Sequence, residues 1–180
     1  MAQIVHEFDP VERFVAGTVG EPGERSFFLQ AKSGKRLISV LLEKSQVLAV
    51  AERLALLLKE LRRTDTSLKI SPTMRDDLPL DIPIMEEFRV GAIGLAWISD
   101  RQLVQIDLQA GVEASAGDQE VSIDEDGPDL LRVFLTLGQV QGFVDRSLAV
   151  VSAGRPPCPF CGMALDPSGH VCPRANGYRR

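Results

Sequence analysis

Short apolar runs separated by turn-forming residues fill the first 42 positions of the chain. Glycine adopts positive φ and proline fixes φ near −65°, so both residues favour turns. Such residues cluster at 9–10, 20–23 and 32–35. The runs between these turns predict four strands that form an antiparallel meander, at 4–8, 13–19, 25–31 and 36–42.

A longer pattern with helical spacing follows this block. Apolar residues recur at intervals of three and four, which predicts a helix over 44–63 with one apolar face: Val47, Val50, Leu54, Leu57, Leu58 and Leu61. A second helix is predicted over 137–153. Thr136 and Gln139 have the spacing of a capping box, in which each side chain bonds a free N–H group of the first turn.

Three more strands are predicted before the second helix. The segment 90–99 is apolar on both faces, as in a central strand, whereas 102–109 alternates between apolar and polar residues. An apolar run at 130–135 then leads into the helix. The segment 64–87 has no periodicity and is rich in prolines and acids, which predicts a long connection over the surface.

The two junctions between strand and helix resemble each other. Gln46 and Gln139 are related by an offset of 93 positions, and the same offset relates Arg53 to Arg146. Either an internal duplication or the general likeness of such junctions explains the match. Both explanations predict an α+β fold with two mostly antiparallel β-meander plus helix units. The expected divisions are a body over 1–154, with halves at about 1–63 and 88–154 joined by a linker at 64–87, and a tail over 155–180.

Composition excludes several classes of protein. With 44% hydrophobic and 25% charged residues, the chain is neither disordered, collagen-like nor a disulfide-dense secreted protein. The three cysteines, the absence of a signal-like N-terminus and the lack of any apolar run near the ~18 residues of a membrane span predict a cytoplasmic protein without a membrane segment.

All three cysteines lie close to a histidine in the tail. Cys158, Cys161, His170 and Cys172 have the spacing C-x2-C-x8-H-x-C. Thiolates and imidazole in such an arrangement are the ligands of tetrahedral Zn²⁺, so the pattern predicts one structural zinc ion in a zinc knuckle. Two alternatives remain: a redox dithiol at Cys158 and Cys161, and a catalytic zinc that leaves His170 or Cys172 unbound.

Other residue patterns point less specifically to a site. The acidic loop 118–129 has carboxylates for Mg²⁺ or Ca²⁺ but lacks the spacing of an EF-hand, which favours a solvated loop. The glycine-rich segment 17–23 lacks the Lys-Ser/Thr of a phosphate-binding loop and favours a turn. His6 is expected to be structural.

Charge is distributed unevenly along the chain. The tail 155–180 has a net charge of +3, and the rest of the protein therefore carries −8 of the total of −5. The tail thus has the right sign for RNA, phosphate or an acidic protein surface, and no signature of DNA binding is present. The candidate contact residues are Arg174, Tyr178, Arg179 and Arg180. Alternatively, the tail folds back on the acidic body.

Motifs at both ends of the chain resemble an actinobacterial family of unknown function. They include Phe8-Asp9-Pro10, the segment 13–23, the segment 153–159 and Pro167-x-Gly169-His170-x-Cys172. The resemblance covers essentially the whole chain and includes all four candidate ligands. It implies a cytoplasmic protein of about this length, and it supplies no activity.

Two functions follow from these observations. The first is a non-enzymatic binding or adaptor protein, whose zinc knuckle and basic tail contact a protein or an RNA. The alternative is an enzyme that acts on an anionic substrate in a pocket between the two β-blocks, held by arginines such as Arg13, Arg25 or Arg155.

Overall fold

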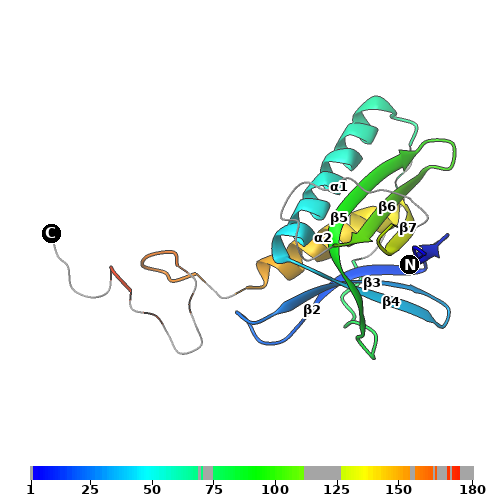
Figure 1. Ribbon diagram of the computed structural model, residues 1–180. Helices are drawn as coiled ribbons and strands as arrows, with labels where there is room; N and C mark the ends of the chain where they lie inside the picture. The colour runs from blue at the N-terminus through cyan, green and yellow to red at the C-terminus, as the bar shows by residue number, and fades with distance from the viewer. Residues whose placement is uncertain are drawn as a thin grey trace.

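The apolar runs of the sequence form seven strands of one mixed sheet, and two helices pack against it (Figure 1). The computed structural model describes residues 2–68, 70, 75–111, 127–154, 157–163, 165, 170 and 172–174. Within them the elements are β1 (Val5–Phe8), β2 (Arg13–Val19), β3 (Ser26–Ser33), β4 (Arg36–Leu42), α1 (Lys44–Thr64), β5 (Glu86–Ile98), β6 (Leu103–Ala110), β7 (Leu130–Thr136) and α2 (Leu137–Ser152).

The sheet joins two antiparallel meanders edge to edge. Its strand order is β1-β7-β6-β5-β4-β3-β2. Strands β2, β3 and β4 form one antiparallel meander, and β5, β6 and β7 form the other. The meanders meet where β4 and β5 pair in parallel. The predicted fold class, α+β with two mostly antiparallel meander plus helix units, is therefore confirmed.

The position of β1 differs from the prediction that it begins the first meander. It pairs in parallel with β7, from Val5 opposite Leu130 to Phe8 opposite Val133. The edge strand β2 does not pair with β1, and the carbonyl of Ala16 in β2 accepts a hydrogen bond from Arg146 of α2. Nearness in the sequence does not decide this pairing. Phe8 is buried where β1 ends.

In each helix, a glutamine in the first turn bonds the residue that precedes the helix. Gln46 Oε1 accepts the N–H of Glu43 at 2.9 Å, and Gln139 Oε1 accepts the N–H of Thr136 at 2.9 Å. Thr136 Oγ1 in turn accepts the N–H of Gln139, so the predicted capping box is confirmed. The first turn of each helix is fixed in this way at the end of the preceding strand.

The hydrophobic core lies between the helices and the curved sheet. Helix α2 packs against α1 and also against β2, β6 and β7. Because β2 and β7 are far apart in the strand order, contact of both strands with α2 requires the sheet to curve around this helix. Among the described residues, the core cluster extends from Phe8 to Val151 and includes Phe14 stacked on Phe143, with ring centroids 4.9 Å apart.

Neither described helix is both long enough and apolar enough to cross a membrane.

Candidate metal centre

A tight turn brings the first two cysteines of the tail together. The N–H of Gly162 donates to the carbonyl of Cys158 at 2.8 Å, and the N–H of Cys158 donates to the carbonyl of Met163 at 2.7 Å. Gly162 has a φ of +75°, a conformation that a side chain would strain. The sequence Cys158-Pro-Phe-Cys161-Gly162 therefore folds back on itself, with both sulfurs on one side.

The four predicted ligands form one cluster. One donor atom from each of Cys158, Cys161, His170 and Cys172 lies within 4.8 Å of all the others. The sulfurs of Cys158 and Cys172 are 3.8 Å apart, and Nε2 of His170 is 3.2 Å from the sulfur of Cys161. These donors lie close enough together to bind a metal ion.

The cluster favours one thiolate before any metal binds. Desolvation opposes ionisation of Cys158, but N–H donors from Cys161 and Phe160 and the two neighbouring thiols outweigh it and lower the pKa of the Cys158 thiol. For Cys161, a backbone hydrogen bond from Met163 acts in the opposite direction, yet burial and the adjacent sulfurs raise the pKa of its thiol. Because the three sulfurs lie close together, ionisation of more than one thiol is unfavourable unless a cation compensates the negative charges.

The imidazole of His170 is also placed as a ligand. Its Nε2 faces the sulfur of Cys161, while its Nδ1 is buried and has no hydrogen-bond partner among the described residues. Burying a ring nitrogen of histidine that has no hydrogen-bond partner is energetically unfavourable. Coordination through Nε2 would offset part of this cost.

The surroundings of the cysteine pair differ from those of a redox dithiol. Such a pair ordinarily begins a long helix, whose N-terminus stabilises the thiolate. Here the pair lies in a turn, and the described residues of 157–174 contain no helix. All three cysteines are free thiols.

Several other predicted residues are placed by the structure. Arg174 donates to the carbonyl of Phe160 at 3.2 Å and so joins the two parts of the knuckle. Nε2 of His6 lies 3.4 Å from the carboxylate of Glu87, and His6 is not part of the cluster of donors. Arg155, Tyr178, Arg179, Arg180 and residues 118–126 of the acidic loop lie outside the described residues.

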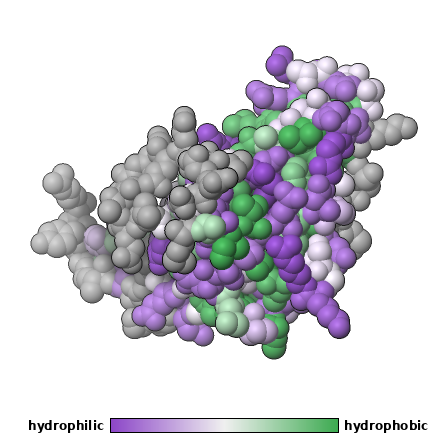
Figure 2. Space-filling view, turned by 45° about the vertical axis from the view of Figure 1, so that its right-hand side comes forward, coloured by the Kyte–Doolittle hydropathy of each residue, from purple (hydrophilic) through white to green (hydrophobic). Residues whose placement is uncertain are grey.

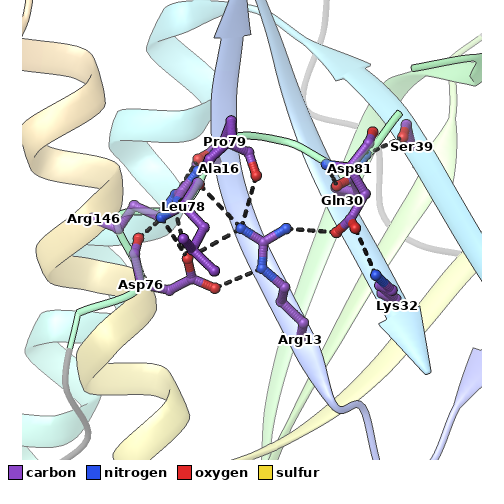
Figure 3. Close-up of polar contacts among 10 residues, drawn as sticks. All are labelled: Arg13, Ala16, Gln30, Lys32, Ser39, Asp76, Leu78, Pro79, Asp81 and Arg146. Atoms are coloured by element: carbon purple, nitrogen blue, oxygen red, sulfur yellow. Dashed lines mark hydrogen bonds and ion pairs between the residues drawn. The ribbon is translucent and has the colours of Figure 1, made fainter. Parts of the chain in front are cut away.

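Arg13, a predicted anion-binding residue, is occupied by carboxylates. Its Nε and Nη1 donate to Asp76 and Asp81 at 2.6 and 2.7 Å (Figure 3). Lys32 also bonds Asp81, and Gln30 exchanges two hydrogen bonds with the backbone of Asp81. Arg13 is therefore neutralised within the protein rather than free to hold a substrate.

The same carboxylates connect to a buried arginine of α2. Arg146 donates from Nε to the carbonyl of Ala16 at 2.6 Å, and from Nη1 to the carbonyls of Asp76 and Leu78 and to the carboxylate of Asp76 (Figure 3). We call the six residues Arg13, Gln30, Lys32, Asp76, Asp81 and Arg146 the clamp. The clamp fixes the segment 75–82 across the edge strand β2. Sequence reasoning did not identify it, because its members are far apart in the chain.

Arg25, the other described candidate, borders a cleft of about 410 Å³. The cleft lies where α1 begins and α2 ends, and not between the two meanders, which are joined through β4 and β5.

Comparison with known proteins identifies one family. A family model described as Protein of unknown function (DUF3090) matches residues 6–172, which include the body and all four clustered donors. Searches of curated proteins and of solved structures found no match.

Proposed function

The chain belongs to this family of unknown function, and we propose that it is a zinc-stabilised binding protein. Its C-terminal knuckle contacts a protein partner. The observation that carries the proposal is the complete set of four donors, three sulfurs and one imidazole, gathered at one point. Four protein ligands fill a tetrahedral zinc ion and leave no position for a substrate or a catalytic water.

The distances support zinc as the bound ion. Zinc–sulfur bonds of about 2.3 Å in a tetrahedron place two sulfurs about 3.8 Å apart. Cys158 and Cys172 have this separation, 3.8 Å. Soft thiolates and imidazole also favour zinc over Mg²⁺ or Ca²⁺, which prefer oxygen ligands.

Zinc would supply the folding energy of the knuckle. Of its described residues only Cys158 and Cys172 are buried, so the segment has little apolar surface to bury. Zinc binding to small modules with such ligands contributes about 10 kcal/mol or more. The metal would therefore order the segment rather than take part in chemistry.

The knuckle exposes the kind of side chains that protein interfaces use. Phe160 and Met163 are 62% and 55% exposed on either side of the ligand Cys161. Phenylalanine, methionine and arginine are enriched in interface centres, and Arg174 is bonded to the carbonyl of Phe160. On the face of the body shown in Figure 2, by contrast, hydrophobic patches are separated by hydrophilic side chains. A protein with an apolar pocket beside acidic groups fits this surface of Phe160, Met163 and Arg174.

Site-specific crosslinking tests the proposal. A photoreactive residue replaces Phe160 in the full chain, and in a control protein it replaces Leu56, which is similarly exposed on α1. We expect one protein to crosslink at position 160 in extracts of the source cells, only when the metal is present, and to be lost with Met163→Ala.

Two outcomes would contradict the proposal. Equal crosslinking from positions 160 and 56 would show that the knuckle is not a specific surface. Crosslinking to RNA instead of protein would show that the basic character of the tail, rather than Phe160 and Met163, determines the partner. A chain that ends at Gly154 is expected to keep its cooperative unfolding, because the described core cluster ends at Val151.

A further inference from the structure

A cleft lies at the point where α1 begins and α2 ends. It encloses about 410 Å³, within the range of roughly 300–1,000 Å³ that is usual for small-molecule sites. The described residues that line it come from the turn before β3, from β3 itself, from the first turn of α1 and from the last turn of α2. Two of these residues, Arg25 and Lys44, are cations.

The charge of the cleft is positive on balance. The described lining residues include Arg25 and Lys44 and no carboxylate. The N-terminus of α1 and the C-terminus of α2 contribute about half a charge each, with opposite signs, so the two helix ends largely cancel. Two full positive charges remain in a protein whose overall charge is −5.

Arg25 is held in place but incompletely bonded. Its Nη1 donates to the carbonyl of Ala153, at the end of α2, at 2.6 Å. Its Nε is buried without a hydrogen-bond partner among the described atoms. Leaving a buried donor of a charged group unpaired is unfavourable, so such a donor calls for a ligand.

Lys44 lies at the N-terminus of α1, where a positive charge is unfavourable. It is the first residue of α1, and the first turn of that helix contains no acid. A cation at a helix N-terminus is repelled by the helix dipole. The ammonium lies near Gly154, 3.6 Å from where a Cβ would stand there, so it faces the same helix junction as Arg25. No described carboxylate forms an ion pair with it.

The rest of the lining is apolar enough for an organic group. Phe27, Val150 and Val151 contribute to the walls. An inorganic oxyanion alone would fill only part of the cleft and would leave these apolar side chains in contact with water. We propose that the cleft binds a small organic phosphate monoester, with its dianionic head between Arg25 and Lys44 and its apolar part against Phe27 and the end of α2.

Binding of phenyl phosphate tests this proposal on the full chain. Amide resonances are followed by NMR during titration with phenyl phosphate, phenylacetate, inorganic phosphate and benzyl alcohol. We expect phenyl phosphate to bind most tightly and to shift the amides of Gly23, Arg25 and Lys44. Lys44→Gln is expected to weaken its affinity tenfold or more, because one charge-assisted contact is lost. Arg25→Lys keeps the charge but loses the guanidinium, and it is expected to weaken binding as well.

Lys59→Gln provides the matched control, because Lys59 is exposed on the same helix and away from the cleft. It is expected to bind phenyl phosphate like the parent protein. The proposal is wrong if phenyl phosphate causes no shift at about 10 mM, if phenylacetate binds more tightly, or if Lys44→Gln and Lys59→Gln bind equally. In the last case Arg25 and Lys44 serve only to complement the carbonyl end of α2. The titration with these probes does not measure zinc binding or partner binding at the knuckle, so either proposal can fail without the other.

Discussion

Arg146 is only 7% exposed, and its guanidinium donates hydrogen bonds from Nε and Nη1. It bonds the backbone of the edge strand β2 and the backbone and carboxylate of the segment that crosses it. Removing a buried arginine with such partners is strongly unfavourable, because the carbonyls of Ala16 and Asp76 lose their donor and the carboxylate of Asp76 loses one of its two arginine partners. The clamp therefore depends on this residue.

Arg146→Ala is expected to lower the free energy of unfolding by about 3–5 kcal/mol. Arg53 is related to Arg146 by the offset of 93 positions and is exposed on α1, so it offers a matched control. Arg53→Ala is expected to change the same quantity by no more than about 0.5 kcal/mol. Urea unfolding of both variants measures the difference. Similar losses for the two variants would show that the clamp does not stabilise the fold.

The carboxylates of the clamp make stability depend on pH. Hydrogen bonds from Lys32 and Arg13 hold the pKa of Asp81 below its ordinary value near 3.8, and Arg13 does the same for the pKa of Asp76. A carboxyl whose pKa is lower in the folded protein stabilises it above the ordinary value. This stabilisation is lost as the pH falls below 3.8 through the folded pKa.

Asp81→Asn is therefore expected to flatten the decline in unfolding free energy below about pH 3.8. Asp100→Asn, at an exposed turn, serves as the control and is expected to leave the decline unchanged. The measurement is the urea midpoint at a series of pH values from about 5 to 2. An equal slope for Asp81→Asn and the parent protein would contradict this assignment.

At the residue level the sequence predicted the cluster of three cysteines and one histidine but not the clamp. Cys158, Cys161, His170 and Cys172 lie within 15 positions of one another, so their spacing alone indicates a common site. The contact between Arg146 and Asp76 spans 70 positions. The sequence places Asp76 in a loop and Arg146 in a helix, and only the path of the chain across β2 brings them together.

Among the elements, the two meander plus helix units have equivalent surroundings. The parallel neighbour of β4 is β5, and the parallel neighbour of β7 is β1. Gln46 bonds the carbonyl of Val90 in β5, while Gln139 bonds the carbonyl of Val11, just after β1. The first turn of each helix thus contains a glutamine that bonds its own cap and also a carbonyl in, or shortly after, the strand parallel to the helix's preceding strand. This likeness exceeds what a chance match of two helix starts requires and favours the internal duplication.

Equivalent glutamines are expected to make similar contributions to stability. Gln46→Ala and Gln139→Ala should each lower the unfolding free energy by about 1 kcal/mol, as the loss of a helix cap does. Gln141→Ala, which removes a partly exposed side chain bonded within α2 and to Arg62, serves as the control and is expected to cost less. Chemical denaturation measures all three. A cost confined to one glutamine would contradict the equivalence of the two units.

Element positions were predicted more completely than element pairing. The bounds of β2, β4 and α1 follow directly from the apolar periodicity and the turn residues. The pairing of β1 with β7 does not, because a strand of four residues carries little information about its partner. Likewise, the parallel contact between β4 and β5 depends on the segment 64–85, whose sequence shows no periodicity.

For the whole molecule, we propose that a body with its own core carries a segment that zinc orders. The described core cluster ends at Val151, and the four donors all follow it in the chain. The body and the tail also differ in charge, −8 against +3. These differences support the proposal that the body provides stability and that the knuckle provides recognition.

X-ray absorption at the zinc edge of the purified full chain, together with its zinc content, tests this claim most directly. We predict about one zinc ion per chain, with three sulfurs at about 2.3 Å and one nitrogen at about 2.0 Å. Cys172→Ser should remove one sulfur from the first coordination sphere or abolish zinc binding, while the body keeps its unfolding transition. A protein prepared with ample zinc that contains none, or a zinc ion with an oxygen ligand from water in place of His170 or a cysteine, would contradict a closed structural site.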